Sequence, residues 1–246
     1  MHTYLFRIAR TGASGAAGPA REFKVTLEDR MTVLDALFEI QRKQDPSLSF
    51  RCSCRVGMCG TCAMTVNWQP RLACQTRVAT LKSDTVTVEP LQTLPVIKDL
   101  VVSLEPFFDK WKRIKPALHP SRKGSKELAI VPPTSEFGKQ SAKKWDCITC
   151  GCCYSACGMT DTHKGYLGPA AINKAMLRLL DPRDNATEER LKVLNDEEGV
   201  WRCHTQFNCV AACPKGINLT DSIMKMKRGL LFPKKFNDKS TFVSGS

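Results

Sequence analysis

The sequence has no apolar run that approaches the roughly 20 residues of a membrane-spanning helix, so we expect the chain not to cross a membrane by itself. Residues 4–10 carry arginines where a secretory signal peptide has its apolar core, so we expect no signal peptide. The sequence also lacks a nucleotide-binding glycine motif and an acid–base constellation beside its cysteines. We therefore expect no substrate chemistry, and no catalytic residue, on this chain.

A formal net charge of +13 over 246 residues indicates an anionic partner. Aromatic residues are not interleaved with the basic clusters, and no nucleic-acid-binding motif is present, so we expect no nucleic-acid partner. An acidic protein partner or an anionic membrane surface would explain the positive charge as well as a nucleic acid would. The basic C-terminal residues have two interpretations of their own: a solvated helix face, or a face toward a membrane or a partner protein. These residues are Lys225, Lys227, Arg228, Lys234 and Lys235.

Cysteine, in contrast, is abundant, with 13 residues in a chain too long to be a disulfide-stapled mini-protein. This content indicates metal-bound thiolates in a reducing compartment. The bacterial-type ferredoxin spacing C-x2-C-x2-C-x3-C is formed by Cys147, Cys150, Cys153 and Cys157. In two-cluster ferredoxins a second run completes the sites, and here it consists of Cys203, Cys209 and Cys213 followed by Pro214. The second run has Gln206 where the template has a cysteine, so one cluster site is one ligand short.

A third pattern has the plant-type 2Fe–2S spacing C-x4-C-x2-C, with a fourth cysteine after an intervening strand: Cys54, Cys59, Cys62 and Cys74. Gly57 and Gly60 suit a loop that needs positive φ and close backbone approach around a cluster. Structural zinc is the alternative for the paired cysteines, but zinc sites take four ligands and seldom use these runs. Cys52 and Cys152 fall outside every template, and we predict that they are buried structural thiols.

The apolar periodicity predicts strands over residues 3–10, 22–27 and 85–89 and a helix over 33–44. Apolar residues over 97–111 share one helical face, with Pro106 starting a second helix, and residues 112–140 form a long connection. Further helices are predicted over 170–180, over 187–194 and after an N-cap at Asn218, with a disordered tail over 240–246. We predict an α+β protein, with a β-grasp plant-type ferredoxin domain (residues 1–95) and an all-α bacterial-type two-cluster ferredoxin domain (residues 96–246).

The order of the three cysteine patterns resembles the iron–sulfur subunit of succinate dehydrogenase and fumarate reductase, respiratory complex II. Residues 94–100, 168–171, 181–184 and 201–216 carry further motifs of that family, and the resemblance covers residues 3–235. It implies that Cys54, Cys59, Cys62 and Cys74 hold a 2Fe–2S cluster, that Cys147, Cys150, Cys153 and Cys213 hold a 4Fe–4S cluster, and that Cys157, Cys203 and Cys209 hold a 3Fe–4S cluster.

The resemblance also implies a succinate:quinone oxidoreductase or quinol:fumarate reductase in which C–H oxidation takes place on FAD in a flavoprotein subunit. This chain would carry single electrons through its clusters toward haem b and quinone in a hydrophobic membrane anchor. The complex would lie on the cytoplasmic face of a prokaryotic inner membrane. Two alternatives remain: a soluble reductase subunit of the heterodisulfide or glycolate type, and a nucleic-acid-associated iron–sulfur protein.

One segment departs from the family pattern. Many members have a proline and then a tryptophan pair lining the quinone pocket, where this chain has Gly158, Asp161 and Thr162. Members with a similar Cys-Gly segment work with di-haem anchors, which implies that electrons pass through haem to a more distant quinone. His204 and Lys227 would then face a haem edge or the anchor. The alternative is a quinone pocket lined mainly by the anchor, and for His204 a role that merely caps the cluster loop.

Overall fold

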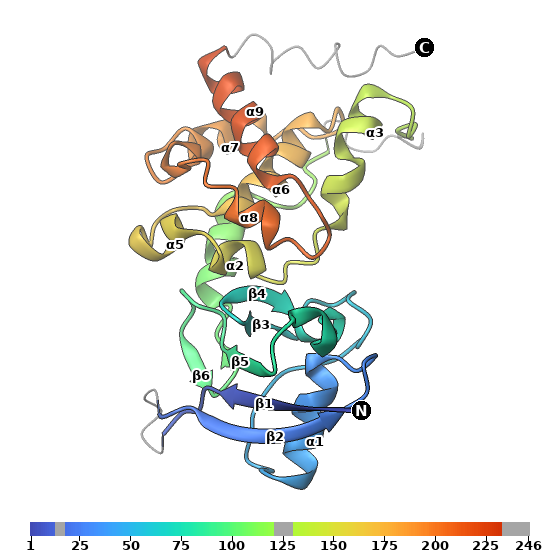
Figure 1. The fold of residues 1–246 in the computed structure, drawn as a ribbon. Coiled ribbons are helices and arrows are strands. Elements are labelled where there is room, and N and C mark those ends of the chain that lie inside the picture. The colour runs from blue at the N-terminus through green and yellow to red at the C-terminus, as the bar shows by residue number, and fades with distance from the viewer. Residues whose placement is uncertain (13–17, 121–129, 233–246) are drawn as a thin grey trace. The chain divides into compact units, whose positions relative to one another are not determined.

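The chain folds into two compact units, described by a computed structural model for residues 1–12, 18–120 and 130–232 (Figure 1). The first unit comprises Met1–Pro106, Ile148–Ala156 and Ala212–Pro214, and the second comprises Phe107–Cys147, Cys157–Ala211 and the chain from Lys215. Both units are therefore built from segments that are separated in the sequence. Lys234, Lys235 and the predicted tail over residues 240–246 lie outside the described residues.

A five-stranded sheet and one helix form the body of the first unit. The strand order is β2-β1-β5-β3-β4, in which β1 pairs antiparallel with β2 and parallel with β5. The elements are β1 (His2–Ile8), β2 (Arg21–Leu27), α1 (Val33–Lys43), β3 (Ala63–Val66), β4 (Gln69–Leu72) and β5 (Thr85–Glu89), with 3-10 turns η1 (Ala73–Gln75) and η2 (Val78–Leu81). The predicted hairpin, helix and closing strand are confirmed. The strand predicted between Cys62 and Cys74 is a two-stranded hairpin, β3–β4.

Alternating burial explains why the sheet and α1 pack together. In β2, Phe23, Val25 and Leu27 are buried and the residues between them are exposed, so one face of the strand enters the core. α1 contacts this strand and begins with a capping box between Thr32 and Asp35, which satisfies backbone N–H groups at the helix start. Figure 1 shows α1 beside β1 and β2.

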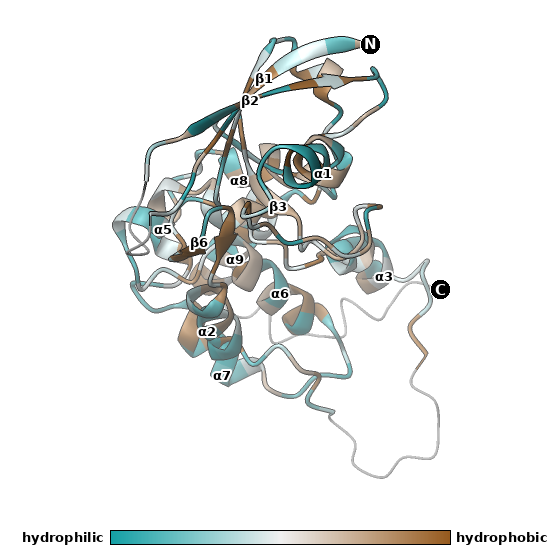
Figure 2. Ribbon diagram, turned by 90° about the horizontal axis from the view of Figure 1, so that it is seen from below, coloured by the Kyte–Doolittle hydropathy of each residue, from teal (hydrophilic) through white to brown (hydrophobic). Residues whose placement is uncertain are grey.

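The prediction of a helix from residue 97 is wrong for the first part of that segment. Residues 96–102 form a small hairpin of β6 (Val96–Lys98) and β7 (Val101–Val102), with Asp99 at a φ of 49° in the turn. β-branched residues dominate both strands and favour extended backbone, although their spacing also matched a helical face. Figure 2 shows the strongly hydrophobic colour of β6. The second predicted helix is present as α2 (Glu105–Arg113), which has Pro106 in its first turn.

Helices make up most of the second unit. Its remaining elements are α3 (Glu136–Ser141), α5 (Gly158–Thr162), α6 (Pro169–Leu180), α7 (Thr187–Leu194), α8 (Asn208–Ala211) and α9 (Leu219–Leu231), with 3-10 turns η3 (Ala142–Asp146) and η4 (Val200–Arg202). α6 and α9 lie side by side in Figures 1 and 2, and Met176, Ile223 and Met226 are buried in their common core. The long helices are those predicted, whereas α3 was not predicted and overlaps the end of the predicted long connection.

A buried ion pair joins two segments of the second unit. Arg190 of α7 and Asp184 are both fully buried, and the guanidinium forms two hydrogen bonds with the carboxylate. Arg190 also donates to the backbone carbonyls of Ile114, Lys115 and Ala117. Burial alone would raise the pKa of Asp184, but the hydrogen bonds from Arg190 and two backbone N–H groups lower it overall.

Candidate metal centres

The first centre lies in the loop before β3 and at η1, and its four cysteines form two neighbouring pairs. Cys54 and Cys59 interact in the solvent-facing part of the loop, whereas Cys62 and Cys74 are buried in the core and interact with each other. The Sγ atom of Cys54 accepts hydrogen bonds from the backbone N–H groups of Met58, at 3.2 Å, and Cys59, at 3.3 Å. Two pairs of thiolates suit a cluster with two irons.

One cysteine of each pair, Cys59 and Cys62, has a shifted pKa, and the two shifts have opposite directions. A hydrogen bond with the Thr61 side chain, followed by contacts with Cys54, lowers the pKa of Cys59 to about 6. Burial raises the pKa of Cys62 to about 12. Cys59 is therefore ready to bind metal as thiolate at neutral pH, whereas Cys62 has to release a proton when metal binds.

The second centre involves the first cubane run. Cys150, Cys153 and Cys213 belong to the first unit and surround the buried Cys152, whereas Cys147 is the last residue of its segment in the second unit. Cys152 is fully buried and shares a hydrogen bond with Cys150 that lowers the pKa of Cys150 to about 7 and raises that of Cys152. The predicted burial is confirmed for Cys152 and is wrong for Cys52, which is only partly buried.

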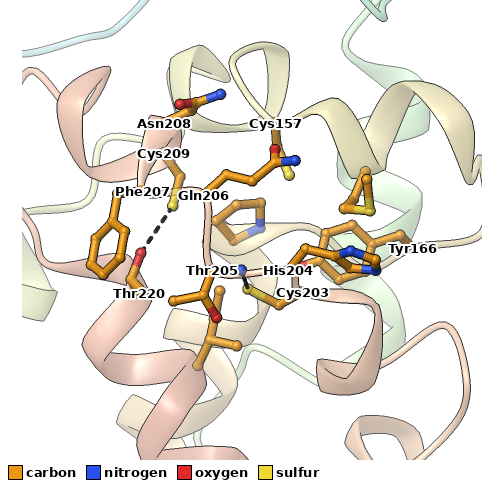
Figure 3. A pocket seen from close by; sticks show the side chains of 13 residues that line it. Cys157, Tyr166, Cys203, His204, Thr205, Gln206, Phe207, Asn208, Cys209 and Thr220 are labelled. Carbon is orange, nitrogen blue, oxygen red and sulfur yellow. Dashed lines mark hydrogen bonds between the residues drawn. The ribbon is translucent and has the colours of Figure 1, made fainter.

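The third centre lies in the second unit, where Cys157, Cys203 and Cys209 line one pocket (Figure 3). The three sulfur atoms lie around a common space in this view, and the Gln206 side chain extends toward Cys157. The Sγ atom of Cys203 accepts a hydrogen bond from the Thr205 N–H at 3.4 Å, and that of Cys209 lies 3.6 Å from the Thr220 hydroxyl. Burial raises the pKa of Cys157 and of Cys209, so metal binding is needed to deprotonate them at neutral pH.

The backbone around Gln206 repeats the backbone around Cys150. Thr149 and Gly151 flank Cys150 with φ angles of 52° and 81°, and Thr205 and Phe207 flank Gln206 with φ angles of 58° and 62°. Positive φ is uncommon for residues other than glycine and strained for a β-branched or bulky side chain. A shared, strained loop geometry supports the template alignment in which Gln206 takes the place of the fourth cysteine.

Among the residues that the structure describes, no three histidine, cysteine or carboxylate side chains converge closely enough to hold a single metal ion. The three cysteine groups consist of free thiols, which are the ligands that hold iron–sulfur clusters. Backbone N–H groups donate to several candidate ligand sulfurs, among them those of Cys54 and Cys203, and such hydrogen bonds tune cluster potentials.

His204 is exposed and lines the pocket of the third centre, and Lys227 donates a hydrogen bond of 2.7 Å to the carbonyl of Cys203. Asp161 and Thr162 are exposed on α5 and are not among the residues that line the pocket. Sequence reasoning missed Met159, Tyr166, Phe207 and Thr220, which do line it. Their positions depend on how the loops close, and no spacing signal in the sequence marks them.

Comparison with known proteins agrees with this geometry. A family model described as a 2Fe-2S iron-sulfur cluster binding domain matches residues 5–109, and one described as a 4Fe-4S dicluster domain matches residues 145–217. The succinate dehydrogenase [ubiquinone] iron-sulfur subunit 1, mitochondrial, of Oryza sativa subsp. japonica is 40% identical over 210 residues, covering 85% of this chain and 74% of the relative. The chain belongs to the succinate dehydrogenase iron–sulfur subunit family.

Other members of this family support the assignment over nearly the whole chain. The corresponding mitochondrial subunit of Candida glabrata is 37% identical over 86% of this chain and 84% of its own length. A chain of the solved Mycobacterium smegmatis Sdh1 complex in the apo form has a TM-score of 0.82 and 28% identity, covering 95% of this chain and 98% of that chain.

The predicted α+β fold, with a plant-type ferredoxin domain followed by a two-cluster ferredoxin domain, is confirmed. As a succinate dehydrogenase iron–sulfur subunit, the chain is the electron-transfer subunit of a membrane-associated oxidoreductase complex, and it carries 2Fe–2S and 4Fe–4S cluster domains. Within the described ranges no helix is long and apolar enough to cross a membrane.

Proposed function

We propose that this chain passes electrons one at a time from a FAD-containing flavoprotein subunit, through a 2Fe–2S, a 4Fe–4S and a 3Fe–4S site, toward quinone in a membrane anchor. When bound, the clusters accept and donate single electrons, which divides a two-electron flavin step into one-electron steps. Support for quinone as the acceptor comes from the relatives, whose names include ubiquinone.

The proposed ligand sets follow the three cysteine groups. They are Cys54, Cys59, Cys62 and Cys74 for 2Fe–2S, Cys147, Cys150, Cys153 and Cys213 for 4Fe–4S, and Cys157, Cys203 and Cys209 for 3Fe–4S. The observation that carries the third set is the pocket in which three cysteines meet and Gln206 occupies the place of a fourth. A side-chain amide is a far weaker iron ligand than a thiolate, so this site holds three irons.

We further propose that haem b in the anchor receives the electrons before quinone does. The exposed Asp161 and Thr162, which match the tryptophan pair of many members, offer no apolar wall for a quinone ring. His204 and Lys227 would lie toward this acceptor, because one lines the pocket of the third centre and the other holds the Cys203 backbone. The complex would lie on the cytoplasmic face of a prokaryotic inner membrane, as the mycobacterial relative suggests, whereas the curated relatives are mitochondrial.

Metal analysis of the intact, detergent-solubilised complex tests the cluster assignment. We expect about nine non-haem irons per copy of this chain, no stoichiometric zinc, and three distinct iron–sulfur signals by electron paramagnetic resonance. Cys203→Ser should abolish the oxidised 3Fe–4S signal, whereas the control Cys52→Ser, outside every ligand set, should retain all three signals. Fewer than three centres in the wild-type complex would refute the proposal.

A further inference from the structure

Gly60 brings the loop of the first centre into direct contact with the loop of the second. Gly60 lies between Cys59 and Cys62 and has a φ of 73°. A Cβ atom placed on it would lie 2.7 Å from the Cβ of Cys150, 3.0 Å from the Cα of Cys150 and 3.1 Å from the carbonyl oxygen of Ile148. Carbon atoms in ordinary contact are about 3.5–4.0 Å apart, so no side chain fits at residue 60 without movement of one loop.

The atoms that face Gly60 cannot move aside independently. They belong to the backbone and first side-chain carbon of the 148–150 segment, rather than to the end of a flexible side chain. Both loops are anchored in the same core, because Cys62, Cys74 and Cys152 are buried in it and Ile148 and Cys150 pack against it. In addition, α4 (Cys152–Ser155), which follows Cys150, contacts β4, the strand that leads to Cys74.

We propose that Gly60 is a positioning residue that sets the spacing between the 2Fe–2S and 4Fe–4S sites. This inference rests on the proposed ligand sets, in which residue 60 lies between two ligands of one site and contacts a ligand of the other. An added methyl group forces the two loops apart by about 1 Å, which is the difference between the 2.7 Å approach and an ordinary carbon–carbon contact. The lack of a side chain at residue 60 therefore keeps the two sites close enough for efficient electron transfer between them.

Gly57 provides a matched control in the same loop. Its φ is also 73°, so an alanine at residue 57 imposes the same backbone strain as an alanine at residue 60. The Cβ at residue 57 would instead meet Cγ of Gln75 at 2.8 Å, and this partly flexible side chain can turn away. A difference between Gly60→Ala and Gly57→Ala thus reports the contact with Cys150 and not the φ angle.

The test is electron paramagnetic resonance on the intact complex, fully reduced with dithionite. A reduced 4Fe–4S cluster speeds the spin relaxation of a nearby reduced 2Fe–2S cluster, and this magnetic interaction falls steeply with distance. The quantity to measure is the microwave power that half-saturates the 2Fe–2S signal. In Gly60→Ala we expect both cluster signals to be retained and the half-saturation power to fall, by up to about twofold for a shift of about 1 Å, whereas Gly57→Ala, which has the same φ strain without the contact with Cys150, should show a smaller change.

An unchanged half-saturation power in Gly60→Ala would overturn the proposal, as would an equal change in both variants, which would point to backbone strain. Loss of the 2Fe–2S signal in Gly60→Ala would also count against it, because residue 60 would then be needed to build the site and not to space it. If the wild-type complex itself lacked either signal, the proposed ligand sets would be at fault, a result distinguishable from failure of the spacing argument.

Discussion

Replacing Arg190 by methionine should destabilise the second unit strongly. The substitution keeps an apolar stem of similar length and removes the charge that pairs with the fully buried Asp184. The carboxylate would keep hydrogen bonds from the backbone N–H groups of His119 and Ala186, at 3.1 Å and 2.9 Å, but it would lose its counter-ion. An unpaired buried charge is the costly product of this substitution.

The expected loss in the free energy of unfolding depends on how deeply each group that contacts Arg190 is buried. Removing one partner of a buried ion pair costs about 3–5 kcal/mol. The carbonyl of the buried Ile114 loses a donor as well, which places the cost toward the upper end of this range, whereas Lys115 and Ala117 are exposed and water can replace the donor there. For a protein of this size, about 2–4 °C of melting temperature corresponds to 1 kcal/mol, so the melting temperature should fall by roughly 6–20 °C.

The assay is a thermal melt of the intact complex, followed by the loss of the oxidised 3Fe–4S signal, since all three proposed ligands lie in the second unit. Glu189→Gln is the matched control, because Glu189 precedes Arg190 in α7 and forms an ion pair with Lys115 in which both side chains are exposed. Exposed pairs contribute about 0–1 kcal/mol, so this variant should melt close to the wild type. If Arg190→Met melted within a degree or two of Glu189→Gln, the reasoning from burial would be refuted.

Three further outcomes are expected. Gln206→Cys should replace the oxidised 3Fe–4S signal with a reduced 4Fe–4S signal and lower the potential of that site; an unchanged oxidised spectrum would show that residue 206 does not face the vacant corner. Asp161→Trp combined with Thr162→Trp should leave quinone reductase activity and inhibitor affinity nearly unchanged, and a large change in affinity would place the quinone beside the third centre. Burial alone would raise the pKa of Asp99, but two backbone N–H groups and Arg10 lower it overall, so its contribution to stability is present above pH ~4 and is lost as pH falls. The urea midpoints of wild type and Asp99→Asn should therefore differ by a constant gap from pH 6 down to pH ~4 and converge below pH ~4, and a gap that stays constant below pH ~4 would contradict this sign.

The cysteine spacings predicted the cluster loops because ligand geometry leaves little freedom in how a loop surrounds a cluster. Gln206 was identified in the same way, by its place in a template. The hairpin over residues 96–102 was not predicted, because Ile97, Leu100 and Val101 fit both a helical face and a twisted strand, and backbone pairing decides between them. The strained φ angles at Thr205 and Phe207 were also beyond sequence reasoning, since neither residue type favours positive φ.

The buried pair illustrates a further limit. The sequence shows a charged arginine in a short amphipathic helix, where exposure is the ordinary expectation. Its burial depends on carbonyls near residue 114 and on a carboxylate at residue 184, and only the closed fold brings these groups together. Sequence periodicity therefore located α7 correctly but assigned no role to the residue on which we expect its stability to depend.

Because the first unit contains segments from three parts of the sequence, its core cannot be completed by the N-terminal residues alone. Leu91 and Leu94 are buried, and Leu91 and Leu104 lie within 3.5 Å of a notional Cβ on Gly151. A chain that ended after residue 106 would thus expose part of its own core, together with the cavity left by Cys152. During synthesis, a ribosome therefore has to release more than 150 residues before Cys152 can complete the core of the first unit.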